Sequence, residues 1–312
     1  MTGGAGFIGS HLVDRLLRDD WYVTALDNFD PFYDPTVKRT NIAKHLRHAR
    51  YRLVEMDICD IEQLPLLDGD FNVVVHMAAK AGVRPSIEDP MGYTRTNIQG
   101  TQNMLELART RGIQQFVFAS SSSVYGVNPD APWREDRAVL QPISPYAATK
   151  VAGELLGHVY SHLHGIRFIA LRLFTVYGPR QRPDLAIHKF ARLILEGKPV
   201  PVYGDGTSLR DYTYVDDVVA GILAAIEYSG SQYEVVNIGN SRTVSLLEMV
   251  HALEDALGVR VKLDMRPPQP GDVPQTWSDI RKAERLLGWR PLTPFATGLG
   301  QFCDWLRVQQ AR

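Results

Sequence analysis

Two side chains one helical turn apart suggest proton transfer. In "SPYAATKVAGE" (144–154), Tyr146 and Lys150 are spaced i,i+4 behind Pro145, a residue typical of a first helical turn. A free tyrosine has a pKa of about 10 and is a poor base at neutral pH, but a neighbouring ammonium favours its phenolate. The pair therefore forms a usable proton acceptor, and the hydroxyls of the run 120–123 can hold a substrate oxygen near the phenol.

A glycine-rich turn at the start of the chain points to nucleotide binding. Its glycines have the spacing G-x-x-G-x-x-G, and a helical pattern follows from Ser10. Glycine permits a tight turn and close backbone approach, while free N–H groups at a helix start attract a pyrophosphate. We assign to this cofactor site Gly3, Gly6, Phe7, Ile8 and Gly9.

Polar residues at the ends of the following strands support the same site. Asp27 ends the next apolar run, 18 residues after Gly9, where a carboxylate can accept hydrogen bonds from an adenosine ribose. A carboxylate there repels a 2′-phosphate, so NAD is favoured over NADP. Two later runs end in Asp57-Ile58 and Ala78-Ala79, on the same expected edge of the sheet.

The apolar runs and the helical patterns between them predict the scaffold. The runs are "WYVTALD" (21–27), "YRLVEMD" (51–57), "FNVVVHMAA" (71–79), "FVFASS" (116–121) and "IRFIALRLF" (166–174). Such continuous β-branched runs separated by helices indicate a doubly wound α/β fold, a parallel Rossmann-type sheet covered on both faces. We expect residues 1–177 to bind the cofactor, and 178–312, rich in proline and glycine loops, to form mainly a smaller substrate-binding lobe with segments that return to the sheet.

The start of the chain raises an expectation about the first strand. A glycine turn of this kind follows the first, central strand of a doubly wound sheet, between strands two and four. Here the turn begins at the second residue. We therefore expect the first strand to be missing and the chain to start about five or six residues late.

Composition excludes several other classes of protein. The 34 Lys and Arg residues balance 35 Asp and Glu residues, so no basic surface indicates nucleic-acid binding. Cys59 and Cys303 are too far apart in the sequence for a metal motif or a disulfide framework, and no segment resembles a membrane span or signal peptide. A cytoplasmic protein without a metal is expected, and the basic stretch 38–50 is interpreted as a solvated helix face.

Taken together, these motifs resemble the extended short-chain dehydrogenase/reductase family, and within it the nucleotide-sugar epimerases. The resemblance rests on the glycine turn, "DN" (27–28), "DI" (57–58), "NIQGT" (97–101), "SSSSVYG", "SPYAATK" and "YGDGTSLRDYTYVDD". It implies that Tyr146 is the base, that Lys150 holds the nicotinamide ribose, and that Ser121 contacts the substrate oxygen. It also places Asn28 and Asn97 in the NAD site and implies a homodimer that pairs the Tyr146 helix and the helix around 98–111 with their mates.

The same resemblance implies a substrate. The stretches 27–42, 81–90, 174–186 and "QPGDVP" (269–274) are similar to UDP-glucuronate 4-epimerases. Oxidation of glucuronate at C4 gives a β-keto acid that is prone to decarboxylation, so the carboxylate must be held in place. Residues that match the family's positions are Ser122, Ser123, Thr175 and Arg182 for the carboxylate pocket, Arg210 for the diphosphate, Tyr203 near the uracil, and Asp272 in the substrate lobe.

Alternative functions remain at this point. Ser122-Ser123 stand where 4,6-dehydratases carry Asp-Glu, and such hydroxyls are poor general acids, so dehydration is disfavoured. Pro145 and Arg180-Gln181 depart from the leucine and Trp-Gly frequent in glucuronate epimerases. UDP-glucose 4-epimerisation is the main alternative, followed by UDP-glucuronate decarboxylation and a non-catalytic NAD-binding scaffold.

Overall fold

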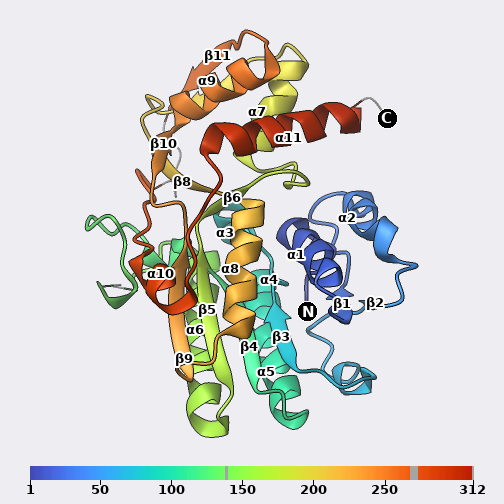
Figure 1. Ribbon diagram of the computed structural model, residues 1–312. Coiled ribbons are helices and arrows are strands. Elements are labelled where there is room, and N and C mark those ends of the chain that lie inside the picture. The colour runs from blue at the N-terminus through green and yellow to red at the C-terminus, as the bar shows by residue number, and fades with distance from the viewer. Residues whose placement is uncertain (138–139, 268–272, 311–312) are drawn as a thin grey trace.

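A parallel sheet covered by helices on both faces forms the larger part of the molecule (Figure 1). The computed structural model describes residues 1–137, 140–267 and 273–310. The strands of this sheet are β1 (Val23–Asp27), β2 (Tyr51–Glu55), β3 (Val73–His76), β4 (Gln115–Ser121), β5 (Arg167–Leu173) and β9 (Tyr233–Ile238). They pair in parallel in the orders β2-β1 and β3-β4-β5-β9. The predicted doubly wound α/β fold is confirmed.

Met1 and Thr2 lie between β1 and β3 and join the two parts of the sheet. Thr2 forms a parallel bridge to Leu26 on one side and to His76 on the other. The Thr2 amide donates to the Val75 carbonyl at 2.9 Å, and the Leu26 amide donates to the Met1 carbonyl at 2.9 Å. The glycine turn therefore leaves the centre of the sheet, where it was predicted, and Met1 and Thr2 alone of the described residues hold that central position.

The side chains of the central strands alternate between two apolar cores. Successive residues of a strand point to opposite faces, so Val117 of β4 faces one core, while Phe116 and Phe118 face the other. Helices α1 (Phe7–Arg18) and α8 (Val215–Glu227) cover the first face, and α5 (Gly100–Thr110) and α6 (Pro145–His164) cover the second. Apolar runs of this kind were read in the sequence as strands buried on both faces. The structure confirms that prediction for β4 and β5, whereas β2, at the edge of the sheet, has one buried residue, two half-buried and two exposed ones.

Short helices follow the carboxyl ends of these strands. They are α2 (Pro35–Ile42), α3 (Val83–Glu88) and α4 (Pro90–Thr94), together with one π turn at Arg95–Gln99 and 3₁₀ turns at Ala43–His45, Leu64–Leu66, Ser122–Tyr125 and Glu135–Arg137. Four of these segments border the cavity described below, through Lys38, Val83, Thr96 and Ser122.

The smaller lobe lies at the carboxyl edge of the sheet, uppermost in Figure 1. Its strands are β6 (Thr175–Tyr177), β8 (Leu209–Tyr214) and β10 (Thr243–Ser245), paired in the order β10-β8-β6, with β7 (Val200–Tyr203) parallel to β11 (Leu263–Arg266). Its helices are α7 (Ala186–Leu195), α9 (Leu246–Leu257) and α11 (Phe295–Gln310). Helix α10 (Arg281–Leu287) packs against β9 of the main sheet, and α8 packs against β4 and β5.

Within the described ranges, no helix is both long and apolar enough to cross a membrane. The same residues contain no group of three or more His, Cys, Asp and Glu side chains placed to hold a metal ion. Cys59 and Cys303 are buried free thiols, and burial raises the pKa of each to about 11, so both thiols are poorly reactive.

Candidate active site

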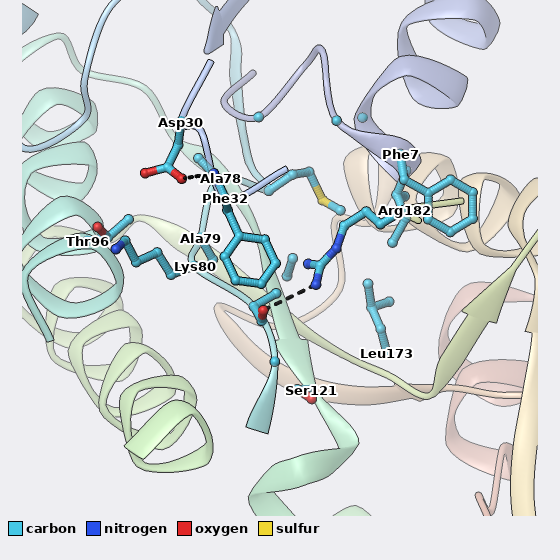
Figure 2. Close-up of a pocket in the computed structure, with 18 of the residues that line it drawn as sticks. Phe7, Asp30, Phe32, Ala78, Ala79, Lys80, Thr96, Ser121, Leu173 and Arg182 are labelled. Atoms are coloured by element: carbon cyan, nitrogen blue, oxygen red, sulfur yellow. Dashed lines mark hydrogen bonds between the residues drawn. The ribbon is translucent and has the colours of Figure 1, made fainter. Parts of the chain in front are cut away.

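A cavity of about 500 Å³ opens at the carboxyl ends of β1, β3 and β4 and collects most of the predicted site residues (Figure 2). This is the edge at which doubly wound sheets bind ligands. From the predicted cofactor set the cavity is lined by Gly3, Gly6, Phe7, Ile8, Gly9, Asp27, Asn28, Asp57, Ile58, Ala78 and Ala79. From the predicted catalytic and substrate sets it is lined by Ser121, Ser122, Ser123, Tyr146, Lys150, Thr175 and Arg182.

The glycine turn presents the start of α1 to this cavity. Gly6 is the N-cap residue and no side chain caps the helix, so N–H groups of its first turn are available to a ligand. A Cβ on Gly9 would lie 2.0 Å from the carbonyl oxygen of Gly3, which only glycine avoids. The turn and helix start thus fit the pyrophosphate of a dinucleotide.

Asp27 is held at the end of β1 by three protein donors. Its Oδ2 accepts from the Ala5 amide at 3.1 Å, and its Oδ1 accepts from the Phe29 amide at 2.9 Å and from Lys38 Nζ at 3.3 Å. The interpretation of 38–50 as a solvated face is therefore wrong for Lys38, which is buried because it pairs with Asp27. Nothing in the local sequence marks Lys38, since its partner is on another element.

Asn97 occupies a different place from the other predicted cofactor residues. It is buried and does not line the cavity. Its Oδ1 accepts from the Lys80 amide at 2.8 Å, and its Nδ2 donates to the Lys80 carbonyl at 2.9 Å and to Thr149 Oγ1 at 3.0 Å. Asn97 therefore fixes the backbone after Ala79, which lines the cavity, and ties it to α6.

A buried histidine lies beneath the same strand ends. His76 Nδ1 is 2.8 Å from Thr2 Oγ1, which accepts from the Ala78 amide, and His76 Nε2 is 3.0 Å from Thr101 Oγ1, which donates to the Asn97 carbonyl. These partners require a neutral ring that carries its proton on Nε2. Burial accordingly lowers the pKa of His76 to about 3.

Helix α6 positions the Tyr146 and Lys150 pair as the sequence predicted. Ser144 caps the helix by accepting from the Ala147 amide at 3.2 Å, and Pro145 occupies its first turn. The helix lies close on the sheet, because Gly157 leaves no Cβ where the Phe168 ring packs, at 2.2 Å from that position. Lys150 Nζ consequently reaches the Ala119 carbonyl at 2.7 Å and lies 5.9 Å from the centre of the Tyr146 ring.

Burial opposes the charged forms of both catalytic candidates. It lowers the pKa of Lys150 to about 8, although the nearby Glu154 carboxylate raises it. It also raises the pKa of Tyr146, while a hydrogen bond with the Ser121 hydroxyl and the charge of Arg182 lower it. Desolvation outweighs these two contributions, and the phenol is protonated at neutral pH.

Glu154, one turn after Lys150, forms a buried network that the sequence did not reveal. Its carboxylate accepts from Arg172 Nε at 2.9 Å and Arg172 NH2 at 2.8 Å, and from Ser120 Oγ at 2.5 Å. Both charged side chains are 4% exposed. The network connects the catalytic face of α6 with β5 and with the residue before Ser121.

The predicted carboxylate-binding side chains meet on one side of the cavity. Ser121 Oγ donates to Ser123 Oγ at 3.1 Å at the end of β4, and Thr175 begins β6, which follows β5, the strand paired with β4. The Arg182 guanidinium donates to the Ala81 carbonyl at 3.3 Å and to Asp184, and stacks on the Phe32 ring at 5.1 Å (Figure 2). Several hydroxyls and one cation therefore face the space beside Tyr146.

Two residues predicted to bind the UDP part of the substrate lie outside this cavity. Tyr203, predicted near the uracil, and Arg210, predicted at the diphosphate, do not line it. Tyr203 lies under the guanidinium groups of Arg84 and Arg266, at 5.6 and 6.0 Å from the ring centre. Asp272 lies outside the described residues. Sequence reasoning also missed a contact of Tyr93, whose ring meets the Tyr146 ring edge-on at 6.3 Å.

Chemically, the cavity combines a dinucleotide-binding edge with a tyrosine, a lysine and a cluster of hydroxyls. Such an arrangement suits removal of a hydroxyl proton coupled to hydride transfer.

Comparisons with known proteins agree with this geometry. The model of the NAD dependent epimerase/dehydratase family matches residues 1–239. A UDP-glucuronate 4-epimerase of Thermodesulfobacterium geofontis is 39% identical over 98% of this chain and 94% of its own. The crystal structure of UDP-glucuronic acid 4-epimerase from Bacillus cereus, in complex with UDP-glucuronic acid and NAD, has a TM-score of 0.93 at 40% identity and covers 99% of this chain and 98% of its own. A UDP-glucose 4-epimerase of Thermotoga maritima, with UDP-glucose, has a TM-score of 0.91 at 32% identity over 99% and 98% of the two chains.

Proposed function

Because the chain belongs to the NAD-dependent epimerase/dehydratase family, we propose that it interconverts UDP-glucuronate and UDP-galacturonate through a 4-keto intermediate. The observation that carries the choice of substrate is the cluster of Ser122, Ser123, Thr175 and Arg182 in the same cavity as Tyr146. Hydroxyls and a guanidinium are the donors that a carboxylate requires.

In the proposed reaction Tyr146 accepts the proton of the 4-hydroxyl, with the Ser121 hydroxyl on the same substrate oxygen. NAD, when bound, takes the hydride from C4 and returns it, and its positive ring also favours the phenolate. The glycine turn, Asp27, Asn28, Asp57 and Ile58 would hold its adenosine and pyrophosphate. Return of the hydride to the opposite face of the turned sugar gives the 4-epimer and leaves no net redox change.

Lys150 serves two purposes in this proposal. Its ammonium would bind the nicotinamide ribose and lower the energy of the Tyr146 phenolate. Its Nζ is already held by the Ala119 carbonyl at 2.7 Å, so little side-chain entropy remains to be lost on binding. The raised pKa of Tyr146 is consistent with a base that becomes active only once positive charge enters the cavity.

The carboxylate donors have a second task. A 4-keto glucuronate is a β-keto acid, and it loses carbon dioxide most readily when the breaking bond is aligned with the carbonyl π system. Donors from two parts of the cavity wall, Ser122 and Ser123 after β4 and Thr175 on β6, would hold the carboxylate away from that alignment.

We further assign residues 1–177 to cofactor binding and most of 178–312, including Tyr203, Arg210 and Asp272, to binding the UDP-sugar. A homodimer is supported by an apolar stripe on α6, where Leu155, Val159 and Leu163 are 58%, 46% and 65% exposed at i,i+4 spacing. A cytoplasmic location is supported by the two free thiols.

The test is incubation of the purified protein with UDP-glucuronate without added NAD, followed by chromatographic separation of the epimers. We expect conversion to UDP-galacturonate and the reverse reaction. Much faster turnover of UDP-glucose would instead assign the chain to UDP-glucose 4-epimerases, and formation of a UDP-pentose would assign it to decarboxylases. NAD binding without turnover of any of these sugars would favour a scaffold.

A further inference from the structure

An ion pair outside the cavity connects Arg180, which departs from the glucuronate-epimerase pattern, with helix α1. The Arg180 guanidinium donates to Asp14 Oδ2 at 2.6 Å and to Ser10 Oγ at 3.2 Å, two positions spaced i,i+4 on α1. The Arg180 and Asp14 side chains are 18% and 15% exposed. A second contact is made by His11, whose Nε2 lies 2.9 Å from the Pro179 carbonyl.

Asp14 also contacts a third segment of the chain. Its Oδ2 also accepts from Lys44 Nζ at 3.0 Å, and its Oδ1 contacts His45 Nε2. These residues belong to the 3₁₀ turn that directly follows α2. Burial raises the pKa of Asp14, but hydrogen bonds from Arg180, His45 and Lys44 and the charge of Arg180 lower it below its ordinary value, so the carboxylate is charged at neutral pH.

Two of the three segments that meet at Asp14 border the cavity themselves. Helix α1 contributes Phe7, and the segment after β6 contributes Arg182 and Leu185. The third segment directly follows α2, whose Lys38 lines the cavity. Figure 2 shows the Arg182 side chain extended toward the Phe32 ring, which comes from a different segment. One carboxylate thus ties two parts of the cavity wall to the turn that follows α2.

The backbone of Arg180 lies two residues before Arg182, which lines the cavity. Arg180 has a φ of +62°, a left-handed conformation that non-glycine residues rarely adopt. Gln181, 2% exposed, donates through Nε2 to the Val176 carbonyl at 3.1 Å. Release of Arg180 from Asp14 would allow its backbone to relax to a negative φ, and Arg182, two residues later, would turn with it.

We propose that Asp14 and Arg180 are positioning residues which fix Arg182 and thereby set the preference for a sugar that carries a carboxylate. This inference rests on the proposed function, because it takes Arg182 as a carboxylate donor. A positioning role and a purely structural role predict different effects on ligand binding. Loosening the fold weakens the binding of every UDP-sugar, whereas a misplaced Arg182 weakens only the binding of the acidic one.

The experiment measures dissociation constants of UDP-glucuronate and UDP-glucose by calorimetry at saturating NAD. All variants carry Tyr146→Phe, so that neither ligand is converted. Arg180→Met and Asp14→Asn remove the ion pair, Arg180→Lys retains a cation, and Arg182→Met is the reference. Asp19→Asn is the matched control, because Asp19 pairs with Arg15 at the exposed end of the same helix.

We expect Arg180→Met and Asp14→Asn to weaken UDP-glucuronate about tenfold, the loss of one charge-assisted contact, and UDP-glucose less than twofold. Arg180→Lys should restore part of the preference, and Asp19→Asn should not alter it. Arg180→Met combined with Arg182→Met should lose no more than Arg182→Met alone, because both act through one contact. Equal weakening of the two ligands, or additive losses, would overturn the inference.

The design separates this inference from the function on which it rests. If Arg182→Met leaves the ratio of the two dissociation constants unchanged, the carboxylate pocket itself is wrong and the inference fails with it. If Arg182→Met shifts the ratio and Arg180→Met does not, only the inference fails. Should Arg180→Met fold poorly, Asp14→Asn gives the same comparison, since asparagine can keep one hydrogen bond at that position.

Discussion

Replacement of Glu154 by glutamine tests the buried ion pair behind the catalytic face of α6. The substitution preserves the size of the side chain but removes the charge that Arg172 faces through two hydrogen bonds of 2.9 and 2.8 Å. Both residues are 3% exposed, so water cannot replace the lost partner. The guanidinium of Arg172 then remains charged and buried over the Tyr125 ring, without the carboxylate that accepted its two hydrogen bonds.

The expected loss follows from that burial. Breaking a buried pair by removing one partner costs about 3–5 kcal/mol. The entropy of unfolding is about 2.1 cal/mol/K per residue, or about 0.66 kcal/mol/K for a chain of 312 residues. The melting temperature should therefore fall by about 5–8 °C.

The assay is thermal unfolding at saturating NAD, so that ligand binding stabilises each variant alike. Glu55→Gln is the matched control. Glu55 also accepts two hydrogen bonds from one arginine, Arg39, but the two side chains are 54% and 53% exposed. Exposed pairs contribute little, and the control should melt within about 2 °C of the parent protein.

A melting temperature of Glu154→Gln within that same interval would refute the reasoning, because it would mean that Arg172 finds water or another partner. A second variant sharpens the result. In the pair Glu154→Met with Arg172→Met no buried charge remains unpaired, so part of the loss should be recovered. A double variant less stable than Glu154→Gln would show that packing rather than charge dominates at this position.

Three further predictions concern the site. Tyr146→Phe removes the proton acceptor, so turnover should fall about 10²–10⁴-fold while bound NAD and melting temperature stay unchanged; wild-type turnover would contradict its role. Thr175→Ala should release some UDP-pentose beside the epimers on chromatography, and an unaltered product profile would argue against a carboxylate contact. The pKa of His76, about 3 in the folded protein against 6.5 in the unfolded chain, means that its contribution to stability is complete above pH 6.5 and lost as pH falls toward 3. His76→Gln should therefore flatten the decline of melting temperature with acid, and an unchanged decline would assign it to other groups.

Local patterns in the sequence were sufficient for the scaffold and for the centre of the site. The run 116–119 is apolar throughout because both faces of β4 are buried, and this distinguishes it from a strand with one solvent-exposed face. Tyr146 and Lys150 lie on one face because their spacing matches the helical period, whatever surrounds the helix. The glycine turn is equally local, since its conformation requires the residues that reveal it.

Residues whose roles depend on distant partners escaped prediction. Lys38 reads as one more charge in a basic stretch, and only the fold brings it to Asp27. Asn97 was assigned to the cofactor by resemblance, whereas in the structure its amide holds the backbone of Lys80. A family motif shows that a residue is needed at a site. It does not show whether that residue contacts the ligand directly or supports another part of the site.

Glu154 combines the two cases, because the sequence predicts the direction of its side chain but its environment was not predicted. The helical period already places it on the face of Tyr146 and Lys150, eight and four residues earlier, so its direction was available from the sequence. The helical period does not show whether that face is buried or exposed two turns after Tyr146. An exposed glutamate there would be one of many surface charges. A buried one needs a cation, and Arg172 meets that need from β5, where the residues 168–171 before it and Leu173 after it are apolar. An arginine flanked on both sides by apolar strand residues is therefore the signal that was present and unused. Because charge is rarely buried without a partner, such a residue predicts an acidic side chain on the helix that covers the strand.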